Sequence, residues 1–304
     1  MHEIAISALI AGATGFVGGR LATSLADSGA QVRCLVRNRG RAAALEARGL
    51  ELHEGDVTVA ASLAGAGRGI DIAYYLVHAM GGGAGYSRRE HQGALNFARM
   101  AKEEGVGRVV YLGGLGDPST SEHLRSRHQT ALTLAAQGPP LTYFRAAMVV
   151  GAGSESYRTL RYLVARLPAM VAPAWLRTTT QPIGIDAAVE YLRRAPGAPE
   201  SEGREVQIGG PDVLTYEEML DRMALAMGKH PRLKLRVPLL TPRLSSLWLG
   251  LVTPVDTSVA RPLVDGLRTP TVVTDPSAAE PFGVEPESFD DALRLALAEE
   301  AREE

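Results

Sequence analysis

Three glycines near the start of the chain have the spacing of a phosphate-binding turn. They are Gly12, Gly15 and Gly18, in a segment AGATGFVG that follows an apolar stretch and leads into a helical pattern. The first glycine permits a tight turn, the second lets the backbone approach a phosphate, and the third lets a helix pack on a strand. The free N–H groups at the helix start attract an anion. This context predicts a dinucleotide-binding turn; the alternative is a glycine-rich turn without a ligand. Further residues expected at this turn are Thr14, Phe16 and Val17.

The end of the second predicted strand favours NADP(H) as the cofactor over NAD(H). This strand reads QVRCLVRN and carries Arg37 where an acid would otherwise hold a ribose 2′-hydroxyl. A guanidinium binds a 2′-phosphate through charge-assisted hydrogen bonds. The alternative is a surface arginine without this role, because only three of the 32 basic residues are lysines and arginine is common throughout the chain.

Composition excludes several classes of protein. The chain has 304 residues and a formal net charge of −2, and its basic residues are scattered, so we expect no nucleic-acid partner. Its single cysteine, Cys34, lies in the second strand pattern, which rules out an internal disulfide. No spacing typical of a metal site is present, and we expect no metal.

Localisation is predicted from the segments that are missing or too short. The first residues, MHEIAIS, lack the basic region of a signal peptide, so we expect a cytoplasmic protein. The apolar run at 244–255 is too short to span a bilayer and is interpreted as a buried helix or a partner-binding face.

Apolar and amphipathic stretches alternate through the first half, as a parallel sheet wrapped by helices requires. The predicted strands lie near 4–11, 31–36, 50–54, 71–77, 108–113 and 141–146. The predicted helices lie near 16–28, 40–48, 59–65, 86–105, 121–137 and 185–194. The expected fold class is α/β, a Rossmann-type doubly wound parallel sheet with a smaller C-terminal α+β lobe.

A Pro- and Gly-rich break at 196–203 indicates two parts. Residues 1–196 are predicted to form the NAD(P)-binding domain, with 154–182 contributing to the substrate lobe. Residues 197–304 are predicted to form the smaller substrate or partner lobe, which carries a strand EVQIGG and a helix after Thr215. The TYEE opening of that helix is typical of a capping box.

Many segments of the chain together resemble the atypical short-chain dehydrogenase/reductases. They are GATGFVGGRL, CLVRN, GDV at 55–57, YYLVHAMG at 74–81, RVVYLGGLGD at 108–117 and YFRAAMVVGAG at 143–153. The most similar branch is the NmrA-like one, which comprises NAD(P)H-binding proteins similar to the nitrogen-metabolite-repression regulator and to the complex I accessory subunit. The stretches TTTQPIGIDAAVEYL, IGGPDVLTYEEML and LLTPRLSSLWLGLVTPV extend the resemblance over nearly the whole chain. The resemblance implies that Asp56 and Val57 flank the adenine, and that Leu76 and His78 lie beside the cofactor.

The catalytic residues of the wider superfamily are absent. They are a serine after the fifth strand and a YxxxK motif on the next helix, whereas this strand ends in Gly113 and Gly114. Aligning SEHLRSRHQ on that motif places His123 at the tyrosine and Arg127 at the lysine. His123 is then predicted to act as a general acid near neutral pH, and Arg127 to bond the ribose. The alternative is a surface histidine and arginine on an amphipathic helix.

His78 is a second candidate for catalysis. It either polarises a substrate carbonyl or lines the nicotinamide pocket, because it follows the fourth strand at the edge where ligands bind. The glycine-rich segment HAMGGGAGY is interpreted as a mobile loop that closes over the site. At its end, Tyr86 is either a substitute acid or an aromatic that packs on the sheet.

The function expected from these features is an NADPH-dependent reductase of a small carbonyl or enone-type substrate. The cofactor brings the hydride, and the protein holds the substrate. The alternative is a non-catalytic NADP(H)-binding sensor or assembly factor with a protein partner. A nucleotide-sugar epimerase or dehydratase is a weaker hypothesis, since the chemistry of these enzymes relies on the missing tyrosine. No membrane span is expected.

Overall fold

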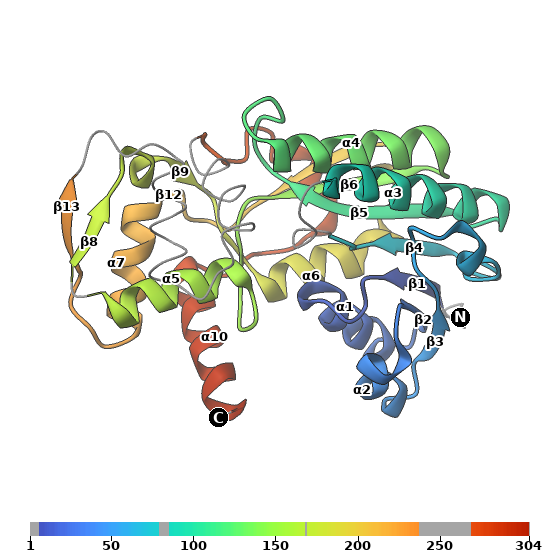
Figure 1. Ribbon diagram of the computed structural model, residues 1–304, viewed down its shortest axis with the longest axis horizontal. Coiled ribbons are helices and arrows are strands. Elements are labelled where there is room, and N and C mark those ends of the chain that lie inside the picture. Colours follow the sequence, from blue (N-terminus) through green and yellow to red (C-terminus); the bar gives the residue numbers. More distant parts are fainter. Residues whose placement is uncertain (1–5, 79–84, 168, 237–268, 304) are drawn as a thin grey trace.

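The computed structural model describes residues 6–78, 85–167, 169–236 and 269–303 (Figure 1). The glycine-rich loop expected to close over the site lies mainly at 79–84, and the apolar run lies at 244–255. Both are outside the described residues. None of the helices in the four described ranges is both long and apolar enough to cross a membrane.

A seven-stranded sheet forms the centre of the larger lobe, with the strand order β11-β6-β5-β4-β1-β2-β3. Every neighbouring pair is parallel. The chain adds β2 and β3 on one side of β1 and then returns to add β4, β5 and β6 on the other side. This reversal of strand order leaves a crevice at the carboxyl ends of the strands around β1. This confirms the predicted Rossmann-type fold. The strands are β1 (Ser7–Ala11), β2 (Gln31–Val36), β3 (Glu51–Glu54), β4 (Ile72–Tyr75), β5 (Arg108–Gly114), β6 (Leu141–Ala146) and β11 (Glu205–Ile208).

Helices cover both faces of this sheet (Figure 1). One face packs on α1 (Phe16–Asp27) and α6 (Ile185–Arg194), and the other on α3 (Tyr86–Glu103) and α4 (Glu122–Gln137). The two layers follow from the alternation of side chains along each strand. All four helices lie where the sequence predicts them, within two residues at each end.

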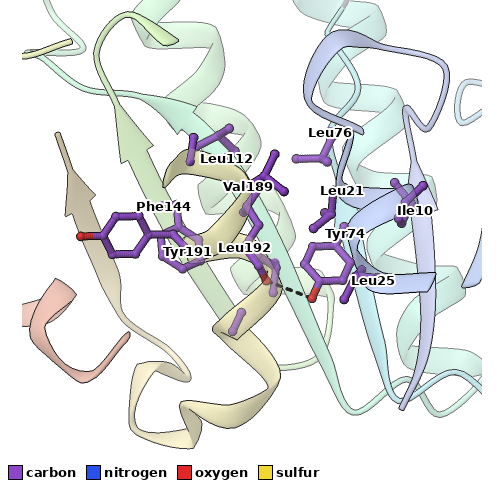
Figure 2. Packing of buried hydrophobic residues seen from close by; sticks show 14 of the residues in the cluster. Ile10, Leu21, Leu25, Tyr74, Leu76, Leu112, Phe144, Val189, Tyr191 and Leu192 are labelled. Atoms are coloured by element: carbon purple, nitrogen blue, oxygen red, sulfur yellow. Dashed lines mark hydrogen bonds between the residues drawn. The ribbon is translucent and has the colours of Figure 1, made fainter. Parts of the chain in front are cut away.

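Figure 2 shows the core on the α1 and α6 face. Ile10 of β1 packs there in one cluster with Leu21 of α1 and Val189 of α6. The hydroxyl of Tyr74 donates a hydrogen bond of 3.1 Å to the carbonyl oxygen of Leu192. This buried bond joins β4 to α6 and so holds α6 against the sheet.

Two of the predicted helices are wholly or partly 3₁₀, and the one predicted near 59–65 is also shorter than expected. The first is a 3₁₀ turn (Arg39–Ala42) that runs into α2 (Ala43–Ala47), and the second is only a 3₁₀ turn (Ala60–Leu63). In the second, the Ser62 hydroxyl donates to the carbonyl oxygen of Val59 at 2.7 Å. A side chain that bonds nearby backbone in this way competes with regular helix formation.

The strand EVQI, predicted in the C-terminal lobe, belongs instead to the central sheet. As β11 it pairs in parallel with β6, with Val206 opposite Phe144. The break before it forms two 3₁₀ turns that dock on the buried Arg108, whose guanidinium donates to the carbonyl oxygens of Pro196 at 3.2 Å and Ala198 at 3.1 Å. These bonds hold the returning chain at the sheet edge, which corrects the placement of this strand. The domain boundary at residue 196 stays a prediction.

In the described part of the smaller lobe, three helices pack together, and Figure 1 shows α5 and α7 on the left. They are α5 (Glu155–Arg166), α7 (Tyr216–Ala226) and α10 (Phe289–Glu303), which share one apolar cluster. The predicted capping box at the start of α7 is confirmed, because the Thr215 hydroxyl accepts from the Glu218 N–H at 3.2 Å and the Glu218 carboxylate accepts from the Thr215 N–H at 2.7 Å. Short strand pairs complete this side of the molecule: β7 (Val149–Val150) with β10 (Ile183–Gly184), β9 (Thr179–Thr180) with β12 (Leu214–Thr215), and β8 (Ala169–Ala172) with β13 (Leu233–Arg236).

Candidate functional site

A cavity of about 990 Å³ opens at the carboxyl ends of the central strands and is lined by both lobes. The fold brings the site residues predicted from the sequence to its wall, with the exception of Tyr86. They are Gly12, Thr14, Gly15, Phe16, Val17, Gly18, Arg37, Asp56, Val57, Leu76, His78, His123 and Arg127. Their individual roles toward a cofactor stay predictions.

The glycine turn has the backbone geometry of an anion site. Gly12 has a φ of +93°, and a Cβ atom there would lie 2.6 Å from the carbonyl oxygen of Leu76. Gly15 is the N-cap residue of α1 and contributes no side chain to the helix start. The first N–H groups of α1 therefore keep their capacity to bind an anion such as a pyrophosphate.

Arg37 leaves β2 at the edge of the cavity with its side chain exposed. Within the part of the chain that the structure describes, its guanidinium has no ion-pair partner. By contrast, Arg39 is paired with Glu46 at 2.5 Å. The Arg37 guanidinium is thus the available cation beside β2 for an anionic group in the cavity.

Asp56 and Val57 form a rigid edge of the cavity after β3. One carboxylate oxygen of Asp56 accepts from both the N–H and the hydroxyl of Thr58, at 2.8 Å each. The carbonyl oxygen of Val57 accepts from the Asn96 amide at 2.8 Å, which ties this edge to α3.

His78, His123 and Arg127 gather at the opposite end of the cavity. Burial, and then the charge of Arg127, lower the pKa of His123 to about 3. His78 is exposed at the end of β4, and the neighbouring Arg127 and His123 also lower its pKa. Both imidazoles are neutral at neutral pH. This differs from the expectation that His123 acts as a general acid near neutral pH, because the ordinary pKa of about 6.5 holds only for a hydrated ring without a neighbouring cation.

The cluster can therefore bind an oxygen atom, but it cannot release a proton near neutral pH. A neutral imidazole donates one N–H hydrogen bond, and a guanidinium stays protonated. Arg127 is held in place because its guanidinium donates to the carbonyl oxygen of Leu112 at 3.4 Å and its own carbonyl oxygen accepts from Tyr111 at 3.3 Å. These bonds fix α4 against the end of β5.

The smaller lobe adds a wall that sequence reasoning missed. It is mostly apolar and aromatic and comprises Met148, Leu160, Leu163, Trp175, Leu176, Tyr216 and Leu220. The sequence carries a signal only for buried residues in α5 and α7, because helical periodicity does not distinguish a face that packs on a core from one that lines a cavity.

Tyr86, the tyrosine proposed from the sequence as a substitute acid, begins α3 but is not among the residues that line the cavity. Burial raises the pKa of its phenol. In the described ranges, no three His, Cys, Asp or Glu side chains are grouped so that they could hold a metal ion.

Comparison with known families decides the class of ligand. The model of the NAD(P)H-binding family matches residues 12–146, which run from the glycine turn to the end of β6. Residues 12–146 form an NAD(P)H-binding domain. This confirms the predicted cofactor class and the family resemblance over that domain.

One curated protein is similar over a short segment. A photosystem II assembly factor of Cyanophora paradoxa is 45% identical over 67 residues, which are 22% of this chain and 21% of that protein. The chain thus matches about a fifth of the length of this relative.

Solved structures share the fold of both lobes. The NADPH complex of a quinone oxidoreductase from Escherichia coli is 19% identical, with a TM-score of 0.75 over 94% of this chain and 98% of that chain. The NADP(H) complex of a triphenylmethane reductase from Citrobacter sp. is 15% identical, with a TM-score of 0.74 over 96% of this chain and 100% of that chain. A nucleoside-diphosphate-sugar epimerase from Staphylococcus aureus is 14% identical, with a TM-score of 0.76 over 95% of this chain and 100% of that chain. At these identities the likeness is one of fold alone.

Proposed function

We propose that this protein is an NADPH-dependent reductase of the carbonyl group or conjugated double bond of a small, mainly apolar molecule. The observation that carries the proposal is the continuous cavity, which begins at the glycine turn and ends against the apolar wall of the smaller lobe. A protein that only binds a dinucleotide has no need of a second wall, whereas a reductase must hold a substrate against its cofactor.

Arg37 supports NADPH as the preferred cofactor. Its guanidinium lines the cavity and is unpaired among the described residues, so a 2′-phosphate there gains a charge-assisted contact. Asp56 and Val57 are the residues that would hold the adenine, and the start of α1 would hold the pyrophosphate.

When bound, NADPH supplies the hydride. The chain's own residues orient the acceptor. The neutral imidazoles of His78 and His123 and the charge of Arg127 favour the build-up of negative charge on a substrate oxygen. The apolar wall excludes water and favours uncharged ring systems, which makes quinones, aryl ketones and cyclic enones the first compounds to test.

The test is NADPH oxidation, followed by absorbance, with a panel of these compounds. Leu163→Gln changes the apolar wall and should raise KM for the active compounds while leaving the Kd of NADPH unchanged. The matched control is Leu225→Gln, on the neighbouring α7 but 62% exposed and away from the cavity. Turnover that is equally sensitive to both variants would reject the wall as the substrate site.

A second candidate is a non-catalytic NADP(H)-binding sensor or assembly factor, and the end of β5 favours it. A Cβ atom on Gly113 would lie 2.6 Å from the ring of Tyr143, so the serine of the wider superfamily does not fit there. The photosystem II assembly factor from Cyanophora paradoxa points the same way. Tight NADPH binding by calorimetry, with no oxidation across the panel, would favour this candidate over the reductase.

A further inference from the structure

Two tyrosines of the described chain line the cavity, Tyr75 and Tyr216. Tyr75 belongs to the core of the sheet, where its ring packs on Phe97 at 5.0 Å and on Tyr111 at 6.1 Å between centroids. Tyr216 comes from the smaller lobe, as the first residue of α7. It is therefore the tyrosine that meets the cavity from the substrate side.

Two threonines lie beside the start of α7, where Tyr216 follows β12. Thr180 pairs with Leu214 between β9 and β12, and it forms a further bridge with Thr271. Thr180 and Thr271 are buried, and their hydroxyls are 2.7 Å apart, with Thr271 donating. Burial raises the pKa of the Tyr216 phenol, and the two threonine hydroxyls lower it by less. The Tyr216 phenol therefore carries its proton at neutral pH. On its other side, the Trp175 ring packs edge-on at 6.4 Å between centroids and fixes the orientation of the phenol.

The same threonines place this hydroxyl group at the end of β5. The methyl group of Thr271 and that of Leu124 flank Gly116, where a Cβ atom would lie 3.1 Å from the first and 3.2 Å from the second. A further bond of 3.1 Å joins Thr269 to Thr120 in the β5–α4 connection. Tyr216, Thr271, Leu124 and His123 all line the same cavity, so the smaller lobe presents Tyr216 to the cavity that also holds the His123 cluster.

We propose that Tyr216 donates the hydrogen bond, and then the proton, to the oxygen of the reduced group, in place of the tyrosine that α4 lacks. The inference rests on the proposed reductase function. In the step, the carbonyl carbon receives the hydride of NADPH and its π electron pair moves to oxygen. That oxygen takes the proton of the Tyr216 hydroxyl, and water restores the phenol through the adjacent threonine hydroxyls. Neither His78 nor His123 supplies this proton near neutral pH, since both are neutral.

The deciding variant is Tyr216→Phe, which removes one oxygen and keeps the ring against Trp175. We expect kcat and kcat/KM to fall together by roughly a hundredfold or more, with the Kd of NADPH and the Tm unchanged. The matched control is Tyr157→Phe in the same lobe, whose hydroxyl donates to Glu300 at 3.0 Å away from the cavity. It should leave turnover unchanged. A merely structural role for Tyr216 would instead lower the Tm and raise KM.

A binding experiment separates this inference from the proposed function. The NADP⁺-bound protein is titrated with 1,4-naphthoquinone in a Trp248→Phe background, so that quenching of tryptophan fluorescence reports occupancy beside Trp175. If the parent binds the quinone without turnover, the reductase is rejected, and about tenfold weaker binding by Tyr216→Phe still supports the hydroxyl contact. Equal affinity of parent and variant for the quinone overturns the hydroxyl contact. A parent that binds no quinone overturns it as well. Full turnover in Tyr216→Phe rejects the proton donor while the reductase stands.

Discussion

The backbone of Gly18 lies directly against the carbonyl group of Gly12, so that a Cβ atom on Gly18 would come 2.2 Å from that oxygen. The first turn of α1 thus packs on the turn that precedes it with no room for a methyl group. This contact sets the position of the helix N-terminus relative to β1, and with it the position of the expected pyrophosphate site.

Gly18→Ala should therefore displace the start of α1 and weaken both NADPH and NADH, because the pyrophosphate is common to the two. We expect a loss of at least about tenfold in each affinity by calorimetry, which corresponds to roughly 1.4 kcal/mol. Gly197→Ala is the control, since nothing lies within 4 Å of a Cβ atom there. Parental affinity in Gly18→Ala would show that the turn does not hold the cofactor.

Arg37→Ala should weaken NADPH binding by about 1.5–3 kcal/mol and leave NADH nearly unchanged, because only NADPH carries a 2′-phosphate. Arg41→Ala is the matched control, because Arg41 is also exposed and follows the same strand but does not line the cavity. Equal losses for the two cofactors, or tighter NADH binding by the parent, would contradict a role in cofactor choice.

His123 should make the folded protein sensitive to acid. Its pKa of about 3 lies below the ordinary 6.5, so between these values the unfolded chain takes up a proton that the folded chain does not. The contribution of His123 to the free energy of unfolding is thus fully present above pH 6.5, and it declines as the pH falls toward 3. Urea unfolding of His123→Gln should show a smaller loss over this range than the parent. An identical pH dependence would place the imidazole in water.

The pH profile of turnover tests the same group in another way. A neutral His123 predicts no decline in kcat as pH rises through 6.5. A decline centred there that disappears in His123→Gln would show a protonated His123, and the proton would then come from this imidazole instead of Tyr216.

Arg108→Met should destabilise the fold by about 1.5–3 kcal/mol, because the carbonyl oxygens of Pro196 and Ala198 lose a charged donor in a buried setting. The control is Arg48→Met, which removes a surface ion pair with Asp27 and should cost less than about 1 kcal/mol. Midpoints of urea unfolding measure both. A similar small shift in the two variants would mean that the 3₁₀ turns before β11 hold without Arg108.

Features set by neighbouring residues were predictable. The glycine turn depends on one strand, one turn and one helix, and all three lie within residues 7–27. The capping box at Thr215 and the six strands with continuous apolar runs are of the same kind. The family model over residues 12–146 covers the part of the chain where such local signals are dense.

Features set by packing between residues far apart in the sequence were not predictable from it. β11 reads as an ordinary strand, and only its pairing with β6 and the bonds to Arg108 assign it to the central sheet. The pKa of His123 depends on burial and on Arg127, neither of which the spacing of the two residues reveals. A side chain's surroundings are a property of the folded molecule.

The amino-acid sequence by itself predicted which residues line the cavity proposed to bind the dinucleotide, because each of them follows one strand of a parallel sheet and all such strand ends meet at one edge. Only the tertiary structure decided what faces that site. Tyr216 looked like the first residue of a helix, and it reaches the cavity because the strand before it pairs with β9, which in turn forms a bridge with Thr271. Contacts of that range depend on how two lobes pack, which no local pattern encodes.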